Sequence, residues 1–270
     1  MASMRRISSR QNPLVARFRD LARARRADGR ALLDGEHLVE EALDSGIRLE
    51  TVAFAERLVH SRADGLVDRV LRSGAEAVRV PDAVMAAISP VRQPSGIVAI
   101  ARAAAASLDD VVRPAPQLVL ILAGIQNAGN VGAIVRAADG CGATGIVTTE
   151  GTADPFGWKA LRGAMGSTFR LPVAAKQPLE STIEHLCRTG IRLVAAAPRD
   201  GTPLPGSNLR GPIAVVLGGE GAGLPDEVLA KAAARITVPM RPPVESLNVA
   251  IAAALILYEA SRQRKPVASV

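Results

Sequence analysis

The sequence has little of three residue types on which many functional sites depend. Aromatic side chains make up 2% of the 270 residues, so few side chains are available to stack on nucleic-acid bases. The two cysteines, Cys141 and Cys187, are too few and too widely separated to hold a fold together. With three histidines besides, the chain offers no cluster of ligands for a metal ion, and we expect no metal.

Long apolar runs are also missing. No stretch reaches the roughly 18 consecutive apolar residues of a transmembrane helix, so we expect no membrane partner. The first residues, MASMRRISSRQNP, contain no apolar segment of the kind found in signal peptides. These two absences predict a cytoplasmic protein.

Positive charge is concentrated at the beginning of the chain. The net charge is +7, and residues 1–30 alone hold nine arginines against Asp20 and Asp28. The remaining residues balance to zero, which predicts a neutral body with a basic end that contacts a polyanion. The alternative is a solvated basic terminus without a partner.

Segments typical of strands and of helices alternate along two regions, which predicts an α/β protein. In the first region we expect strands at 31–35, 49–56, 76–81 and 96–101, and helices at 12–29, 36–46, 61–74 and 82–89. In the second we expect strands at 118–124, 145–149, 191–197, 213–219 and 235–240, and a last helix from Ser246 to about Arg264. Residues 105–117, in an alanine-rich stretch that ends in prolines, predict a linker between a domain at 1–104 and a domain at 118–270.

The first notable loop follows the apolar strand LVLILAG. Gly124 and Gly129 have the spacing of a phosphate-binding loop, but Asn130 and Val131 stand where that loop needs Lys and Ser or Thr. We expect Asn130 to cap a helix that ends near residue 140 and carries Arg136 in its second turn. A helix N-terminus, an amide and one guanidinium suit a single phosphate or a ribose oxygen. The alternative is an ordinary turn beside a surface arginine.

Two further loops follow apolar strands of the same domain. Four glycines surround Glu220 in GGEGAG and permit a ligand to approach the backbone closely, although such a run is often just a turn. Three prolines in VPMRPPVESLN stiffen a loop that delivers Glu245, Ser246 and Asn248 to the last helix. Taken by itself, this loop is better explained with Ser246 as a helix cap and Asn248 as a residue of the first turn. Because the three loops occur together, we favour a functional site.

Together these loops resemble the SpoU (TrmH-type) branch of the SPOUT RNA methyltransferases. The three motifs of that family match, in order, Asn130 with Arg136, then Gly218, Glu220, Gly221 and Gly223, and finally Ser246, Leu247, Asn248 and Val249. The run RPPVESLN departs from many relatives, which have a glycine and small residues before the serine. The first region is similar to the small ribosomal-protein-like α/β domain with which many members bind RNA.

The resemblance implies a fold and a reaction. The second domain would be a SPOUT-type parallel sheet with a trefoil knot, and it would bind S-adenosylmethionine. Cofactor contacts would come from Ala196, Gly218, Val238, Met240 and Leu247. The acceptor would be the 2′-hydroxyl of an RNA ribose.

The resemblance also implies roles for the motif residues. We expect Arg136 to hold a phosphate and stabilise charge on the attacking oxygen, because a guanidinium is a reluctant base. Asn130, Glu220, Ser246 and Asn248 would orient it and the ribose. RNA contacts are expected at Arg5, Arg6, Arg10, Arg17 and Arg136.

Substrate and assembly follow from the same resemblance. The separate first domain favours ribosomal RNA, and transfer RNA is the alternative. A homodimer is expected through the apolar face of the last helix, from Ile251 to Tyr258. A non-catalytic RNA-binding protein on the same scaffold is the main rival of this interpretation.

Overall fold

The protein folds into two units. A computed structural model describes residues 4–23, 29–58, 64–219, 221 and 223–264. Contacts assign Met1–Ala104 together with Phe156–Phe169 to the first unit, and Ala105–Pro155 together with Arg170–Val270 to the second. From the sequence we expect one continuous first domain at 1–104, a linker at 105–117 and a second domain at 118–270. These boundaries remain a prediction.

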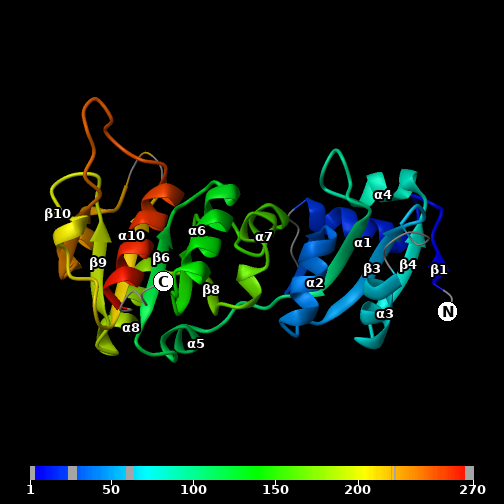
Figure 1. Ribbon diagram of the computed structural model, residues 1–270, viewed down its shortest axis with the longest axis horizontal. Helices are drawn as coiled ribbons and strands as arrows, with labels where there is room; N and C mark the ends of the chain where they lie inside the picture. The colour runs from blue at the N-terminus through cyan, green and yellow to red at the C-terminus, as the bar shows by residue number, and fades with distance from the viewer. Residues whose placement is uncertain (1–3, 24–28, 59–63, 220, 222, 265–270) are drawn as a thin grey trace, which may run out of the picture. The chain divides into compact units, whose positions relative to one another are not determined.

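The first unit is built on a five-stranded sheet with the order β1-β4-β3-β5-β2. Its strands are β1 (Arg5–Arg6), β2 (Arg30–Asp34), β3 (Leu49–Ala55), β4 (Glu76–Val80) and β5 (Ile97–Arg102). Its helices in this part of the chain are α1 (Pro13–Ala22), α2 (Glu36–Asp44), α3 (Asp64–Arg72) and α4 (Asp82–Ile88) (Figure 1). The strand and helix types expected here are confirmed, and the short edge strand β1 is an addition. The helix expected at 12–29 ends at Ala22, and residues 24–28 and 61–63 of the expected helices lie outside the described residues.

A β-bulge interrupts the centre of this sheet. Strand β5 runs antiparallel to β3, and Leu49 pairs with Ala101 while Thr51 pairs with Ile100. Glu50 therefore has no partner in the ladder. A bulged residue bends its strand and changes the direction of its side chain.

A segment from the second half of the sequence completes the first unit. It contains α7 (Trp158–Ala164) and the 3-10 turn η1 (Ser167–Phe169). Trp158 packs against the core cluster around Phe18 and donates a hydrogen bond from Nε1 to the carbonyl of Ala22, at 3.0 Å. At Gly166 (φ +88°) an added Cβ would lie 2.7 Å from Cγ of Glu41 in α2. Only glycine permits this close approach of the segment to α2.

The second unit contains a seven-stranded sheet in which every pairing is parallel. The strand order is β10-β12-β9-β11-β6-β7-β8. The strands are β6 (Leu118–Ala123), β7 (Gly145–Thr149), β8 (Val173–Gln177), β9 (Arg192–Ala196), β10 (Thr202–Pro203), β11 (Ile213–Gly218) and β12 (Ala234–Thr237). The helices are α5 (Leu108–Val112), α6 (Ala128–Gly140), α8 (Leu179–Arg188), α9 (Asp226–Lys231) and α10 (Val249–Arg264). The expected parallel sheet is confirmed; the trefoil knot is compatible with it and remains a prediction.

Several parts of the second unit differ from the sequence expectation. Residues 105–117 contain α5, where the Ser107 side chain and the Asp110 side chain cap each other's backbone and Val111 is fully buried. The last helix begins at Val249 rather than at Ser246, because the Asn248 side chain takes the capping position. Strands β8 and β10 were not expected.

Candidate active site

The glycine-rich loop after β11 folds back on itself. Gly219 forms a bridge with Gly223, and Gly221 and Gly223 have positive φ of +98° and +66°. A Cβ added at Gly218 would lie 2.5 Å from the carbonyl carbon of Gly223 and 2.8 Å from the nitrogen of Leu224. Both are backbone atoms that cannot rotate away. Glycine at position 218 therefore allows the backbone of the loop to pack directly against the end of β11.

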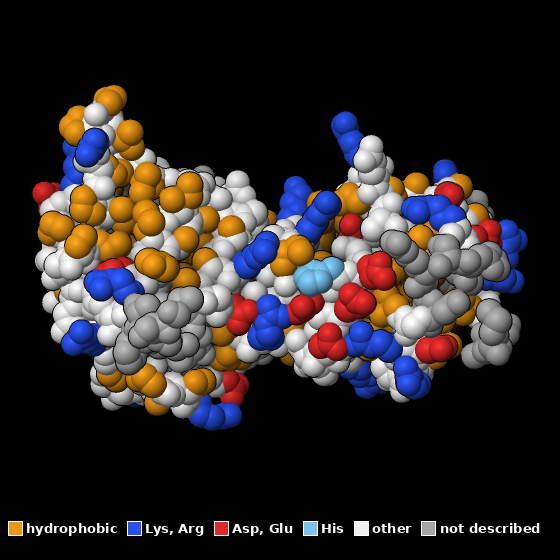
Figure 2. All heavy atoms as spheres, in the orientation of Figure 1, with side chains coloured by type: hydrophobic (Ala, Val, Ile, Leu, Met, Phe, Trp, Pro, Cys, Tyr) orange, Lys and Arg blue, Asp and Glu red, His pale blue; other side chains and the backbone are white. Residues whose placement is uncertain are grey.

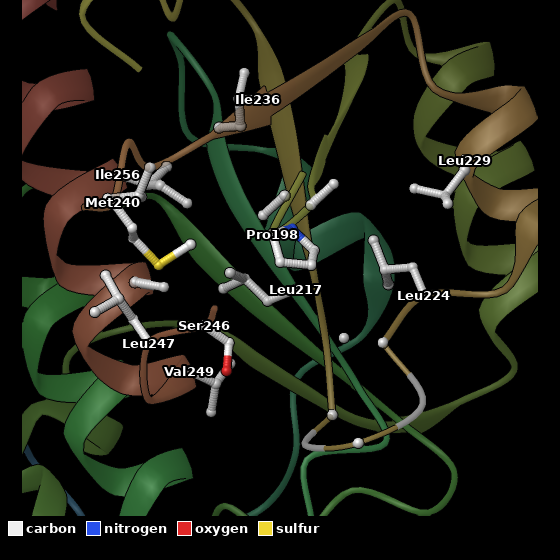
Figure 3. A pocket seen from close by; sticks show the side chains of 18 residues that line it. Pro198, Leu217, Leu224, Leu229, Ile236, Met240, Ser246, Leu247, Val249 and Ile256 are labelled. Carbon is white, nitrogen blue, oxygen red and sulfur yellow. The ribbon is translucent and has the colours of Figure 1, made fainter. Parts of the chain in front are cut away.

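This loop forms one wall of a pocket of about 480 Å³. The other walls come from the segment after β9, the segment after β12, and the start of α10. In Figure 3, Met240, Leu247 and Ile256 gather on one side, Leu224 and Leu229 lie on the other, and Leu217 and Pro198 lie between them. All five residues expected to bind a cofactor line this pocket: Ala196, Gly218, Val238, Met240 and Leu247. Ser246 lines it as well and brings a hydroxyl.

Helix α6 begins three residues earlier than expected. Gly124, with φ +70°, makes the turn after β6, and Asn127 caps the helix. Its Oδ1 accepts hydrogen bonds from the backbone nitrogens of Gly129 (2.8 Å) and Asn130 (3.3 Å). The expectation that Asn130 is the cap is wrong, because Asn127 fills this role and leaves the Asn130 side chain for another contact.

That contact joins the first and third motifs. Asn248 donates a hydrogen bond from Nδ2 to Oδ1 of Asn130 at 3.2 Å. Its own Oδ1 accepts from the backbone nitrogens of Ala250 (2.9 Å) and Ile251 (3.4 Å), so Asn248 also caps α10. Ser246, two residues before Asn248, lines the pocket. The two motifs thus meet at one edge of the pocket.

The two remaining expected catalytic residues are not placed in this cluster. Arg136 lies on the exposed side of α6, about 9 Å along the helix axis from Asn130, and does not line the pocket. Within the residues that the structure describes, its guanidinium has no hydrogen bond or ion pair, so it is available to an external anion. Glu220 lies outside the described residues.

An ion pair at the pocket rim was missed by the sequence reasoning. Nη2 of Arg199 lies 3.0 Å from Oε1 of Glu245, and both side chains are exposed. Arg199 follows the pocket residue Pro198, and Glu245 precedes the pocket residue Ser246, so the pair links two loops of the wall. Arg199 lies three residues beyond the end of β9, but Glu245 lies eight residues beyond the end of β12, so the distance from a strand does not predict this pair.

The arginines expected to contact RNA from the first unit already have partners. Three are ion-paired to glutamates: Arg5 to Glu76 at 2.6 Å, Arg6 to Glu56 at 2.6 Å, and Arg17 to Glu50 at 2.9 Å. Arg10 donates to the carbonyl of Ala83 at 3.2 Å. The hydrogen bond from Arg6 lowers the pKa of Glu56, so this pair stays charged at neutral pH.

Comparison with known proteins agrees with this geometry. Residues 117–258 match the SpoU rRNA Methylase family, and residues 12–99 match the MRM3-like substrate binding domain. The first match covers the pocket, the glycine loop and most of α10. The second lies within the first unit.

Similarity to individual proteins extends over nearly the whole chain. A tRNA/rRNA methyltransferase of Synechocystis is 35% identical, over 96% of this chain and 94% of the relative. The 23S rRNA (guanosine(2553)-2′-O)-methyltransferase RlmP of Bacillus subtilis is 32% identical, over 94% and 98%. The crystal structure of an AdoMet-bound rRNA methyltransferase from Sinorhizobium meliloti is 28% identical and matches with a TM-score of 0.86, over 96% and 98%. The chain therefore belongs to the SpoU rRNA methylase family of RNA methyltransferases.

Proposed function

We propose that the chain transfers the methyl group of S-adenosylmethionine to the 2′-hydroxyl of a ribose in ribosomal RNA. The observation that carries this proposal is the pocket, in which main-chain groups of the glycine loop face apolar side chains beside the Asn130–Asn248 contact. The B. subtilis relative, named for 2′-O-methylation of 23S rRNA, supports the choice of ribosomal RNA. Transfer RNA is the second candidate, since the Synechocystis relative is named for both.

The pocket fits the proposed methyl donor in size and chemistry. Its volume of about 480 Å³ lies within the range of roughly 300–1,000 Å³ that is usual for small-molecule sites. We propose that Leu247 packs on the adenine, and that backbone groups of Ala196, Gly218, Val238 and Met240 recognise its polar edge and the ribose. The four glycines Gly218, Gly219, Gly221 and Gly223 line the pocket without side chains, which supports this because a ligand can approach their backbone closely.

Bound S-adenosylmethionine would supply a methyl group on a positively charged sulfur. The chain has to align the ribose oxygen with that methyl group, and alignment alone can contribute several kcal/mol to the rate. We propose that Asn130, Asn248 and Ser246 orient the ribose, together with Glu220. Arg136 would hold the adjacent phosphate and stabilise negative charge on the 2′-oxygen, because a guanidinium stays protonated and donates in a planar fork.

Two measurements test the proposed function. Calorimetric titration of S-adenosylmethionine into the purified protein is expected to show saturable binding, and no heat with folded protein would reject the methyl donor. Mapping of ribose methylation in total RNA, from cells with and without the protein, is expected to reveal a ribosomal RNA site that disappears. A site lost from transfer RNA would change the substrate, and no lost site would reject the reaction.

We also propose that the protein is a homodimer through α10. Ile251, Leu255 and Tyr258 lie on one side of this helix and are 54%, 41% and 67% exposed, while Ala253, Ile256 and Leu257 on the opposite side are buried. Figure 2 shows hydrophobic side chains gathered over this helix. Although α10 is apolar on two sides, the described residues include no helix with the length and apolarity needed to cross a membrane.

Replacing Ile251 by glutamate is expected to convert the dimer into a monomer, because a charge buried without a partner at an interface costs several kcal/mol. Light scattering measures the mass in solution. The matched control is Val244→Glu, which places the same charge at an apolar side chain of equal exposure, 53%. A wild-type protein with a monomeric mass would contradict the proposal.

A further inference from the structure

Two buried threonines hold the turn between β6 and α6 in place. Strands β6 and β7 are parallel neighbours, so the segment that follows β7 starts beside this turn. In that segment the hydroxyl of Thr152 accepts a hydrogen bond from the backbone nitrogen of Gly124 at 3.0 Å and donates one to the carbonyl of Leu122 at 2.8 Å. The hydroxyl of Thr149 also accepts from the Gly124 nitrogen, at 3.3 Å. Thr149 and Thr152 are only 4% and 9% exposed, so these hydrogen bonds lie away from water, where they are stronger than at the surface.

A backbone hydrogen bond extends this contact. The nitrogen of Ala153 donates to the carbonyl of Ile125 at 2.9 Å, and Ile125 is fully buried. Residues Thr149, Thr152 and Ala153, which we call the turn clamp, therefore bind the chain before, at and after Gly124. Gly124 has a φ of +70°, so the clamp fixes the backbone at the point where the chain turns from the strand towards the helix.

The same turn contacts a wall of the pocket. A Cβ added at Gly219 would lie 2.9 Å from the carbonyl carbon of Gly124, and closer still to its oxygen. Gly219 lines the pocket, so the backbone of the turn packs directly against the glycine loop. The residues of the turn clamp do not line the pocket. The clamp therefore sets where the turn rests against the pocket wall without being part of that wall.

The turn leads directly into the helix that carries the proposed catalytic groups. Asn127, three residues after Gly124, caps α6, and Asn130 and Arg136 follow on this helix. The contact between Asn130 and Asn248 joins the helix to α10, and the turn joins it to the glycine loop. A displacement of the turn would therefore move Asn130 and Arg136 relative to the pocket.

We propose that Thr152 is a positioning residue for methyl transfer, which holds Gly124 against Gly219 and thereby keeps Asn130 and Arg136 aligned with the bound methyl donor. The inference rests on the proposed function, and it assigns Thr152 no contact with a substrate. A misplacement of about 1 Å, caused by a change far from the reacting atoms, can lower a rate by about 10²-fold. A relaxed turn is therefore expected to slow the methyl-transfer step more than it weakens binding of the donor.

Thr152→Val tests the turn clamp, because valine has nearly the shape of threonine but lacks the hydroxyl. The change removes the donor to the Leu122 carbonyl and leaves the Gly124 nitrogen with the more distant acceptor, Thr149. Single-turnover methylation of unmodified 23S rRNA transcript at saturating S-adenosylmethionine is expected to slow by roughly tenfold or more. The Kd for S-adenosylmethionine, measured by calorimetry, is expected to change little, since Thr152 does not line the pocket.

Two further variants serve as controls. Thr152→Ser keeps the hydroxyl and is expected to react at nearly the wild-type rate. Thr182→Val removes a buried hydroxyl elsewhere in the same unit, since Thr182 is fully buried in α8 and donates to the carbonyl of Pro178 at 2.7 Å. This variant is expected to lower the melting temperature about as much as Thr152→Val does, without slowing the reaction.

Thr149→Val decides the question if Thr152→Val does not fold, because it removes the second acceptor of the Gly124 nitrogen and is expected to slow the reaction severalfold. A wild-type single-turnover rate in Thr152→Val, or in Thr149→Val when the first variant does not fold, would overturn the inference. Equal losses of rate in Thr152→Val and Thr182→Val would also overturn it, because lower stability alone would then explain them. A wild-type protein that neither binds S-adenosylmethionine nor methylates the transcript would reject the proposed function itself, a result distinct from an active wild type with unaffected variants.

Discussion

Arg136→Ala is expected to abolish methyl transfer while binding of S-adenosylmethionine persists. Arg136 does not line the pocket, so its removal leaves the walls of that site unchanged. Its guanidinium is exposed and, within the described residues, unpaired, so it has no structural contact to lose. Loss of one group that stabilises developing charge typically lowers kcat by about 10²–10³. Single-turnover methylation and calorimetry on the same preparation measure the two effects separately.

The matched control for this variant is Arg188→Ala. Arg188 is an exposed arginine in the last turn of α8 in the same unit, so its replacement removes the same charge from a helix surface. Arg188→Ala is expected to retain activity. Arg136→Lys keeps the charge without the planar fork and is expected to recover part of the rate. Wild-type turnover in Arg136→Ala would remove this residue from the mechanism.

Gly218→Ala is expected to weaken binding of S-adenosylmethionine by roughly ten- to a hundredfold. The added methyl group would lie 2.5–2.8 Å from backbone atoms of Gly223 and Leu224, and therefore has to displace the loop that forms a pocket wall. Forcing extra atoms into a packed site typically costs about 1–3 kcal/mol, and each 1.4 kcal/mol corresponds to about tenfold in affinity. Calorimetric titration gives the affinity, and thermal unfolding shows whether the protein remains folded.

Gly140→Ala serves as the control for the glycine substitution. Gly140 ends α6, and an added Cβ there meets no atom within 4 Å. This variant is expected to bind the methyl donor as the wild type does. A folded Gly218→Ala protein with wild-type affinity would show that the glycine loop is not part of the binding site.

The sequence predicts most elements of the protein and the composition of its pocket. Apolar strands followed by glycine- or proline-rich loops led to residues that the structure brings together, including Ser246 in the pocket and Asn248 in contact with Asn130. It predicts local details less well. Asn127 and Asn130 have the same capping propensity, and only the backbone geometry shows which of them begins α6. Helix α5 was not predicted because it lies in an alanine-rich stretch that we interpreted as a linker. The spacing of Ser107 and Asp110, which form a capping box, does indicate a helix there.

Other features could not be predicted because they depend on contacts between distant residues. The ion pair of Arg5 joins residues that are 71 positions apart in the sequence, and that of Arg6 joins residues 50 positions apart. Strand pairing brings these residues together, and counting charges along a sequence does not predict which strands pair. The β-bulge at Glu50 was not predicted either, because β3 is buried almost continuously and its residues show no alternation that would mark a shift of register. The number of charged residues thus located a basic region but did not predict the ion pairs within it.

The assignment of Phe156–Phe169 to the first unit affects how such proteins can diversify by recombination. The polypeptide passes from one unit to the other three times, so a gene fusion with a single crossover near residue 105 would exchange only part of the first unit. In such a chimaera, Trp158 of one parent would have to pack against α1 of the other. In the present protein its indole Nε1 donates a hydrogen bond to the carbonyl of Ala22. Exchange of substrate recognition between homologues therefore requires α7 to be inherited together with the N-terminal segment.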